Sequence, residues 1–272
     1  MQLERIDDPS DPRVADYRDL PDPELRRRRG LFVVEGRDIA AMLLDSARFS
    51  ARSVFLTEAA LADLADRLAE RADVRVFVAS AAIVRSIVGY RFHRGCLALG
   101  ERGPDSAPAA LIDRPGPRLL VAAEHVTNPD NVGGIFRNGF AFGVDAVLLS
   151  GRSADPLYRK SIRVSIGGSL AVPFARLDDW PAGLERMRAC GYIVIALTPH
   201  RAAMDIAHLD IDARRLARVA LLVGAEDHGL SAESRASADF QVRIAMAPGV
   251  DSLNVATATG IALHRLASRA AR

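Results

Sequence analysis

Asn131 and Arg137 bring an amide and a guanidinium to the stretch TNPDNVGGIFRN (127–138), which follows an apolar run typical of a buried strand. We expect Asn131 to cap a helix, so that Arg137 lies about a turn and a half inside it. The helix neighbours of this arginine at i−4, i−3 and i+4 are all small: Gly133, Gly134 and Ala141. Because this spacing leaves little bulk around a side chain that suits phosphate, it predicts that a large ligand approaches Arg137. The alternative is a tight strand-to-helix turn in which the glycines allow close packing and the arginine is solvated.

A second stretch, ALLVGAEDHGLS (220–231), also runs from an apolar strand into a polar loop bounded by glycines. Gly224 and Gly229 permit a close approach of the backbone. Glu226 lies at the carboxyl end of the strand, where open α/β sheets bind ligands. His228 has the chemistry of a general base, although a solvated loop histidine is the more common case.

A third stretch, IAMAPGVDSLNVATATGIALH (244–264), follows another predicted strand. Pro248 and Gly249 are expected to turn the chain, and Asp251 or Ser252 to cap a helix. Small residues on several faces of this helix allow close contact with another backbone, and simple packing of a C-terminal helix is the alternative. Since three strand ends each offer glycine with an amide, carboxylate or hydroxyl, we expect one composite site at a single edge of a sheet.

Several kinds of site are disfavoured by what these stretches do not contain. None matches GxGxxG or a GxxxxGK phosphate loop, which argues against an ordinary Rossmann dehydrogenase or NTPase. None offers a ligand set with metal spacing, so we predict a site without a metal. Cys96 and Cys190 form no CxxC or Cys/His pattern, which argues against structural zinc and disulfides and favours a reducing compartment.

Composition limits the class of protein. The chain has 272 residues, enough for two domains, and 49% of them are hydrophobic, enough for a substantial core. The formal charge of +2 arises from 36 basic and 34 acidic residues, so any nucleic-acid surface must be a local cluster. The N-terminus is charged and no apolar stretch is long enough to cross a bilayer, so we expect a soluble, cytoplasmic protein without a membrane partner.

Short apolar runs alternate with helical patterns in both halves of the chain. In the first half, predicted strands lie at 31–36, 52–57, 74–79 and 95–100, with helices at 37–46 and 58–71. In the second half, the predicted strands lie at 119–123, 144–149, 192–197, 219–223 and 240–246, and a last helix is predicted at about 253–268. Near-continuous apolar strands between helices predict a mainly parallel sheet covered on both faces. We therefore predict an α/β fold with a smaller α/β domain over 1–99, a linker rich in Gly, Pro and Ala over 100–117, and a second domain over 118–272.

The three stretches, taken together and in this order, resemble the three motifs of the SpoU (TrmH) family of RNA ribose 2'-O-methyltransferases, part of the SPOUT class. The similarity covers about residues 118–268. A looser match, FVVEGRD (32–38), resembles the ribosomal-protein-like RNA-binding domain of many members, including the thiostrepton-resistance methyltransferases. The resemblance implies an α/β fold with a deep trefoil knot in the C-terminal domain, S-adenosylmethionine bound in that knot, and a homodimer formed through the same domain.

The resemblance also implies roles for particular residues. Cofactor contacts fall on residues of the second and third stretches: Gly224, Glu226, Gly229, Ile244, Met246, Ser252, Leu253 and Asn254. Catalytic roles fall on five polar side chains: Asn131, Arg137, Glu226, Ser252 and Asn254. Arg137 would position a phosphate and stabilise developing negative charge, or act as the base, although arginine side chains are in general poor bases. The chain departs from the usual I-P-M-x-G pattern at Ala245 and Pro248, and Gly249 is expected to restore the turn one position later.

Clusters of basic side chains form the predicted RNA-binding surface. They are Arg26, Arg27, Arg28, Arg29, Arg91, Arg94, Arg159, Lys160 and Arg163. Tyr90 and Phe92 lie among them and could stack on bases, whereas the run at 26–29 has the alternative of a solvated helix face. The resemblance to the SpoU (TrmH) family implies a methyltransferase that acts on a ribose 2'-hydroxyl of rRNA or tRNA. The alternatives are a knotted module that binds RNA and cofactor without turnover and an enzyme that acts on a small metabolite.

Overall fold

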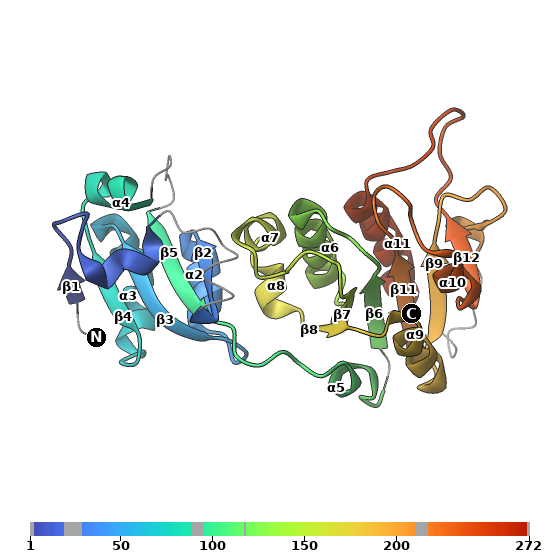
Figure 1. The fold of residues 1–272 in the computed structure, drawn as a ribbon, viewed down its shortest axis with the longest axis horizontal. Coiled ribbons are helices and arrows are strands. Elements are labelled where there is room, and N and C mark those ends of the chain that lie inside the picture. Colours follow the sequence, from blue (N-terminus) through green and yellow to red (C-terminus); the bar gives the residue numbers. More distant parts are fainter. Residues whose placement is uncertain (1–2, 19–28, 89–94, 117, 210–216, 271–272) are drawn as a thin grey trace. The chain divides into compact units, whose positions relative to one another are not determined.

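The computed structural model describes residues 3–18, 29–88, 95–116, 118–209 and 217–270. Its contacts divide the chain into two compact units, and Figure 1 labels most of their elements. The first unit comprises Met1–Pro104 and Leu157–Ala171, and the second comprises Asp105–Pro156 and Val172–Arg272. The predicted domain boundaries, and the role predicted for each domain, stay predictions.

The first unit contains, within its described residues, a five-stranded mixed sheet with the order β1-β4-β3-β5-β2. Its strands are β1 (Leu3–Arg5), β2 (Leu31–Glu35), β3 (Ser50–Leu56), β4 (Arg75–Val78) and β5 (Cys96–Glu101). β4 is parallel to β1 and β3, whereas β5 is antiparallel to β2 and β3. Strands β2 to β5 confirm the predicted ones. The short β1, with the sequence LER, has no apolar pattern from which it could have been predicted.

Helices and an aromatic core complete the first unit. The helices are η1 (Pro12–Tyr17), α2 (Arg37–Leu44), α3 (Glu58–Ala69) and α4 (Ala81–Val88), with α7 (Arg159–Ser165) and α8 (Gly168–Ala171) grouped in the same unit. α2 and α3 confirm the two helices predicted from apolar spacing. The rings of Tyr17 and Phe55 lie 5.4 Å apart between centroids in the core, where Phe55 is fully buried.

The second unit contains, within its described residues, a seven-stranded sheet with the order β10-β12-β9-β11-β6-β7-β8. Its strands are β6 (Arg118–Ala123), β7 (Ala146–Ser150), β8 (Phe174–Leu177), β9 (Ile193–Leu197), β10 (Met204–Asp205), β11 (Arg218–Val223) and β12 (Phe240–Arg243). Every pair of neighbours is parallel, which confirms the predicted parallel sheet. The five predicted strands are all present, although β12 ends at Arg243 rather than at 246. β8 and β10, at the two edges of the sheet, were not predicted.

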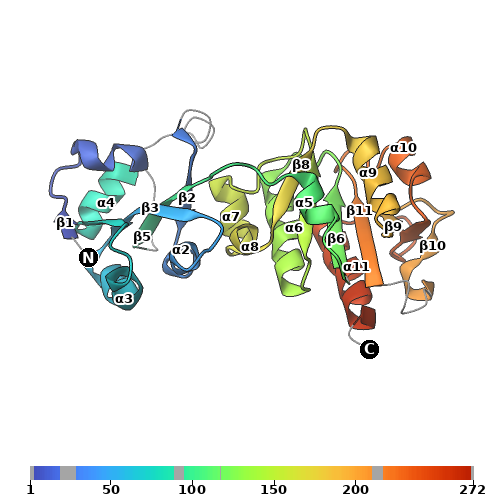
Figure 2. The same cartoon turned by 90° about the horizontal axis from the view of Figure 1, so that it is seen from below.

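Helices bury both faces of this sheet, as its apolar strands require. The helices are α5 (Pro108–Ile112), α6 (Pro129–Ala141), α9 (Trp180–Ala189), η2 (Ile206–His208), α10 (Ala232–Ala236) and α11 (Val255–Ala270). On one face, alternate strand residues such as Leu120 and Leu222 form a core with Trp180 and Leu184 of α9. α6 and α11 pack side by side in the same unit (Figure 2). α5 lies within the stretch predicted to be a linker, and α11 confirms the predicted last helix.

The order of the strands reverses between β6 and β11. From β6 the chain adds β7 and then β8 on one side, whereas β9, β11 and β12 lie on the other side. Open α/β sheets bind ligands outside the carboxyl ends of their strands at such a switch point. The first two chemical stretches follow β6 and β11, so the topology brings them to this place. No helix within the described ranges has the length and apolar character needed to cross a bilayer.

Candidate active site

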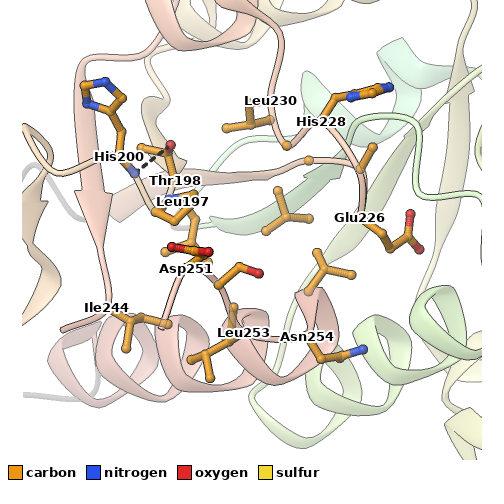
Figure 3. Close-up of a pocket in the computed structure, with 18 of the residues that line it drawn as sticks. Leu197, Thr198, His200, Glu226, His228, Leu230, Ile244, Asp251, Leu253 and Asn254 are labelled. Carbon is orange, nitrogen blue, oxygen red and sulfur yellow. Dashed lines mark hydrogen bonds between the residues drawn. The ribbon is translucent and has the colours of Figure 1, made fainter. Parts of the chain in front are cut away.

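A cavity of about 820 Å³ lies at the carboxyl ends of β9, β11 and β12 (Figure 3). All the residues predicted to contact a cofactor line it: Gly224, Glu226, Gly229, Ile244, Met246, Ser252, Leu253 and Asn254. The loop after β9 also lines the cavity with Thr198, His200 and Arg201, which sequence reasoning missed. That loop has neither a glycine pair nor an amide. Its position at the end of a predicted parallel strand was therefore the only sequence signal that it belongs to the site.

The loop after β11 is a closed hairpin. The backbone N–H of Ala225 donates to the carbonyl of Gly229 at 3.2 Å, and the N–H of Gly229 donates back at 3.0 Å. A Cβ atom on Gly224 would lie 2.1 Å from the carbonyl carbon of Gly229 and 2.2 Å from the nitrogen of Leu230. Only glycine therefore fits at position 224, since the obstructing atoms are backbone rather than flexible side chain.

Three side chains join the three chemical stretches in one hydrogen-bonded network. The amide of Asn131, which is 6% exposed, donates to the Glu226 carboxylate at 2.7 Å. The carbonyl oxygen of the same amide accepts from the side-chain nitrogen of Asn254, also at 2.7 Å. Figure 3 shows Glu226 and Asn254 on the side of the cavity near α6, which contains Asn131. The structure thus brings three of the predicted catalytic residues together across 123 positions of sequence.

The two helix caps differ from the predicted ones. Asn128, rather than Asn131, caps α6 by accepting the N–H of Asp130 at 2.9 Å. The prediction of Asn131 as the cap is wrong because Pro129, whose fixed φ suits the first helical position, begins the helix earlier. Asn254, rather than Asp251 or Ser252, caps α11 and accepts the N–H groups of Ala256 at 2.9 Å and Thr257 at 3.2 Å. Both corrections release a polar side chain from capping: Asn131 joins the network, and Ser252 lines the cavity.

The turn before α11 forms in spite of the unusual sequence there. The N–H of Val250 donates to the carbonyl of Ala247 at 3.2 Å, and Gly249 has a φ of 84°. Proline followed by a glycine with positive φ is the pattern of a type II turn. Gly249 therefore makes the turn one position later than the family pattern, as predicted.

Gly134 allows α6 and α11 to approach closely. A Cβ on Gly134 would lie 2.5 Å from the Cβ of Ala256 on α11. One turn further along, the amide of Asn138 donates to the carbonyl of Ala256 at 2.7 Å. The prediction that this glycine clears space for a ligand at Arg137 is therefore wrong, and the packing alternative is supported.

We expect Gly134→Ala to lower the free energy of unfolding by about 1–3 kcal/mol, as overpacking does. Helix propensity alone predicts the opposite sign, a gain of about 1 kcal/mol. Chemical denaturation should show the loss, and adding Ala256→Gly to the same chain should restore most of it. A matched control is Gly151→Ala, since a Cβ at Gly151 would meet no atom within 4 Å. An increase in stability in Gly134→Ala would contradict the close contact.

Arg137 is exposed on α6. Among the described residues, no hydrogen bond or ion pair joins it to the network of Asn131, Glu226 and Asn254. The network therefore fixes the helix on which Arg137 lies, and the guanidinium faces solvent, where a substrate can meet it.

The basic residues predicted to bind RNA are described only in part. Arg26, Arg27, Arg28, Arg91 and Arg94 lie outside the described residues. Arg29 forms an ion pair with Asp16. Arg159, Lys160 and Arg163 lie on α7, where Lys160 and Arg163 are exposed. The RNA-binding role of all of these residues stays a prediction.

Neither cysteine belongs to a metal site among the described residues, where no group of three or more His, Cys, Asp or Glu could hold an ion. Cys96 is buried in the first unit, and burial raises the pKa of its thiol to about 12. The Cys190 thiol donates to the Asp113 carboxylate at 3.4 Å, and partial burial together with this carboxylate raises its pKa. Both thiols are therefore protonated at neutral pH.

A fully parallel sheet, a cavity at the carboxyl ends of β9, β11 and β12, next to the switch point, and a polar network beside that cavity define the class of open α/β proteins that bind a small ligand at strand ends. Within this class, the chain belongs to the SpoU rRNA methylase family, whose model matches residues 118–264. This match confirms the family predicted from the three stretches. The family implies a trefoil knot in this unit.

Relatives extend the match over nearly the whole chain. An uncharacterized tRNA/rRNA methyltransferase of Mycobacterium bovis is 39% identical over 97% of this chain and 91% of its own. The 23S rRNA (guanosine-2'-O-)-methyltransferase RlmB of Acinetobacter baylyi is 29% identical over 72% of this chain and 79% of its own. The crystal structure of AdoMet-bound rRNA methyltransferase from Sinorhizobium meliloti superposes with a TM-score of 0.82 at 25% identity and covers 97% of both chains. The predicted class, an RNA methyltransferase, is confirmed at this level.

Proposed function

We propose that this protein transfers a methyl group from S-adenosylmethionine to a ribose 2'-hydroxyl of rRNA or tRNA. The observation that best supports this is the network of Asn131, Glu226 and Asn254, which joins the cavity-lining loops to the helix of Arg137. Two relatives support the finer assignment: the RlmB enzyme is named for guanosine 2'-O-methylation, and the Sinorhizobium meliloti structure holds AdoMet.

The cavity fits S-adenosylmethionine in size and chemistry. Its volume of about 820 Å³ lies within the usual range for small-ligand sites. Leu197, Ile244 and Leu253 offer apolar surface for a purine, and the hairpin from Gly224 to Leu230 forms part of the lining. Glu226 and Asp251 place carboxylates in the lining, which suits a ligand with a sulfonium and an ammonium charge.

The side chains of the site contribute alignment and charge. When bound, S-adenosylmethionine supplies an activated methyl group on its sulfonium. Glu226 and Asn254 hold Asn131 between them, so the loops and the start of α6 keep one geometry. Alignment of reacting groups contributes up to about 7–11 kcal/mol in favourable cases. We expect Arg137 to hold an RNA phosphate and to stabilise negative charge as it develops on the attacking oxygen, since a guanidinium is a cation with several N–H donors.

Labelled S-adenosylmethionine tests the proposal directly. The purified chain is incubated with total rRNA and tRNA, and the labelled RNA is hydrolysed with alkali. Alkaline cleavage needs a free 2'-hydroxyl, so ribose methylation leaves the label in alkali-stable dinucleotides, whereas base methylation leaves it in mononucleotides. Label in mononucleotides would overturn the 2'-O assignment. Cofactor binding without any incorporation would favour the binding module that lacks turnover.

We expect methyl transfer to continue in excess EDTA. An oxygen nucleophile that displaces the sulfonium from the methyl carbon needs no Lewis acid. In our proposal, the positive charge of Arg137 stabilises the attacking oxygen instead. The RNA should be kept folded with hexamminecobalt(III), whose filled coordination sphere cannot act as a metal catalyst. Loss of transfer in EDTA that a divalent ion restores, with the RNA still folded, would show that this mechanism is incomplete.

We also propose that the protein is a homodimer through α6 and α11. These helices pack together, yet Phe140 on α6 is 53% exposed and Ile261 on α11 is 42% exposed. In sedimentation experiments we expect the parent to be a dimer and the double variant Phe140→Asp, Ile261→Asp to be a monomer. Met204→Asp is the matched control because Met204 is 37% exposed on another element, β10. A parent that sediments as a monomer at micromolar concentration would rule out this interface.

RNA capture by the first unit, which groups residues 1–104 with 157–171, completes the proposal. The run at 26–29 and the exposed cations of α7 are its candidate residues. Basic side chains that neutralise phosphates release counterions, so the salt dependence of RNA binding reports how many of them take part.

A further inference from the structure

Glu124 follows β6 directly and is buried, with 4% of its surface exposed. A buried carboxylate needs hydrogen-bond partners, because burial removes its water. It lies outside the set of residues that line the cavity, so a direct contact with a ligand does not account for it. The hydrogen-bond partners of Glu124 show instead that it holds the hairpin after β11.

Glu124 contacts both ends of the hairpin after β11. Its backbone N–H donates to the carbonyl of Val223, the last residue of β11, at 2.8 Å. Its carboxylate accepts the N–H of Ser231, the cap of α10, at 2.9 Å. Everything between these two bonds, from Gly224 to Leu230, lines the cavity.

The attachment at Ser231 continues into the core. The hydroxyl of Ser231 accepts the N–H of Ser234 at 3.1 Å and lies 2.9 Å from the hydroxyl of Ser234. The hydroxyl of Ser234, in turn, accepts from the indole N–H of Trp180 at 2.8 Å. Because Trp180 belongs to the core of this unit, the far end of the hairpin is fixed to the rigid sheet through Glu124 and Ser231.

We infer that Glu124 is a positioning residue for cofactor binding, because it holds the hairpin 224–230 at the width at which its backbone can contact S-adenosylmethionine. This inference rests on the proposed function for the identity of the ligand. Without the carboxylate, the N–H of Ser231 loses its partner, and the end of the hairpin loses its direct hydrogen bond to the end of β6, although the bonds of Ser231 to α10 and the buried side chain of Leu230 remain. Glutamine in its place would keep an oxygen that accepts the same hydrogen bond.

Hydrogen exchange of the free protein tests the geometry without any cofactor. We expect amides in the peptide that spans 224–231 to exchange at least about tenfold faster in Glu124→Ala than in the parent, because exchange follows local opening. Glu124→Gln should exchange like the parent. Glu233→Ala is the matched control because Glu233 is an exposed glutamate on α10, next to the same hairpin. Unchanged exchange in Glu124→Ala would overturn the inference.

Calorimetry with S-adenosylmethionine, in the absence of RNA, tests the effect on the cofactor. We expect Glu124→Ala to weaken binding at least about tenfold, which corresponds to about 1.4 kcal/mol, while Glu124→Gln and Glu233→Ala stay within about threefold. In turnover assays the KM for the cofactor should rise, while kcat at saturating cofactor changes by less than about threefold.

A fall in the stability of Glu124→Ala with unchanged affinity for S-adenosylmethionine would mean a structural role only and would overturn the inference. Absence of binding by the parent would overturn the proposed function and this role in cofactor binding, whereas binding without methyl transfer would overturn the proposed function alone.

Discussion

The Arg137→Ala variant is expected to lose methyl transfer by about 10²- to 10³-fold, the usual effect of removing a group that stabilises a developing oxyanion. Its affinity for S-adenosylmethionine should stay within about twofold of the parent, because no residue of α6 belongs to the described lining of the cavity. Since the lost contact is made in the transition state, kcat and kcat/KM should fall together. Single-turnover transfer and calorimetry with the cofactor measure the two effects separately.

Two further variants locate the cause of that loss. Arg137→Lys keeps the charge but not the planar fork, so we expect it to recover only part of the rate. Arg188→Ala is the matched control, because Arg188 is an exposed arginine of α9 whose 3.7 Å ion pair with Asp239 is worth little. If Arg137→Ala lost cofactor affinity in proportion to its rate, Arg137 would belong to the cofactor site and our assignment would be wrong.

The parallel sheet was predictable because its central strands are apolar on both faces. β6 and β11 bury four and five of their six residues in unbroken runs, so the sequence shows them without alternation. The edge strands β8 and β10 have four and two residues, too few for any pattern to stand out. Their positions are decided by pairing with β7 and β12, which is information from the tertiary fold.

The site was predictable in its residues but not in its local geometry. Motif resemblance selected side chains from two loops that all line one cavity. The helix caps were misassigned because Asn128 and Asn131 are chemically identical candidates, and only the start of α6 at Pro129 decides between them. Glu124 was not singled out at all, since a lone glutamate at a strand end has no sequence signature until its partner, Ser231, is known.

The Gly224→Ala variant is expected to lose affinity for S-adenosylmethionine by about 10- to 100-fold, and methyl transfer at low cofactor concentration with it. The added methyl would lie within 2.5 Å of three backbone atoms of Gly229 and Leu230, so the hairpin must open to admit it. Overpacking of a rigid contact costs about 1–3 kcal/mol, and that amount sets the expected range of affinity loss.

The cost of this substitution falls on the hairpin that forms the wall of the cavity. The bonds between Ala225 and Gly229, at 3.2 and 3.0 Å, close that hairpin, and an alanine at 224 pushes directly against its return strand. Calorimetry on Gly224→Ala, with Gly151→Ala as the control in open space, should therefore show the loss at one glycine and not at the other. If Gly224→Ala bound the cofactor like the parent and retained a folded structure by circular dichroism, the hairpin could not be the cofactor-contacting wall. The ligand would then have to be held chiefly by the loops after β9 and β12, which also line the cavity.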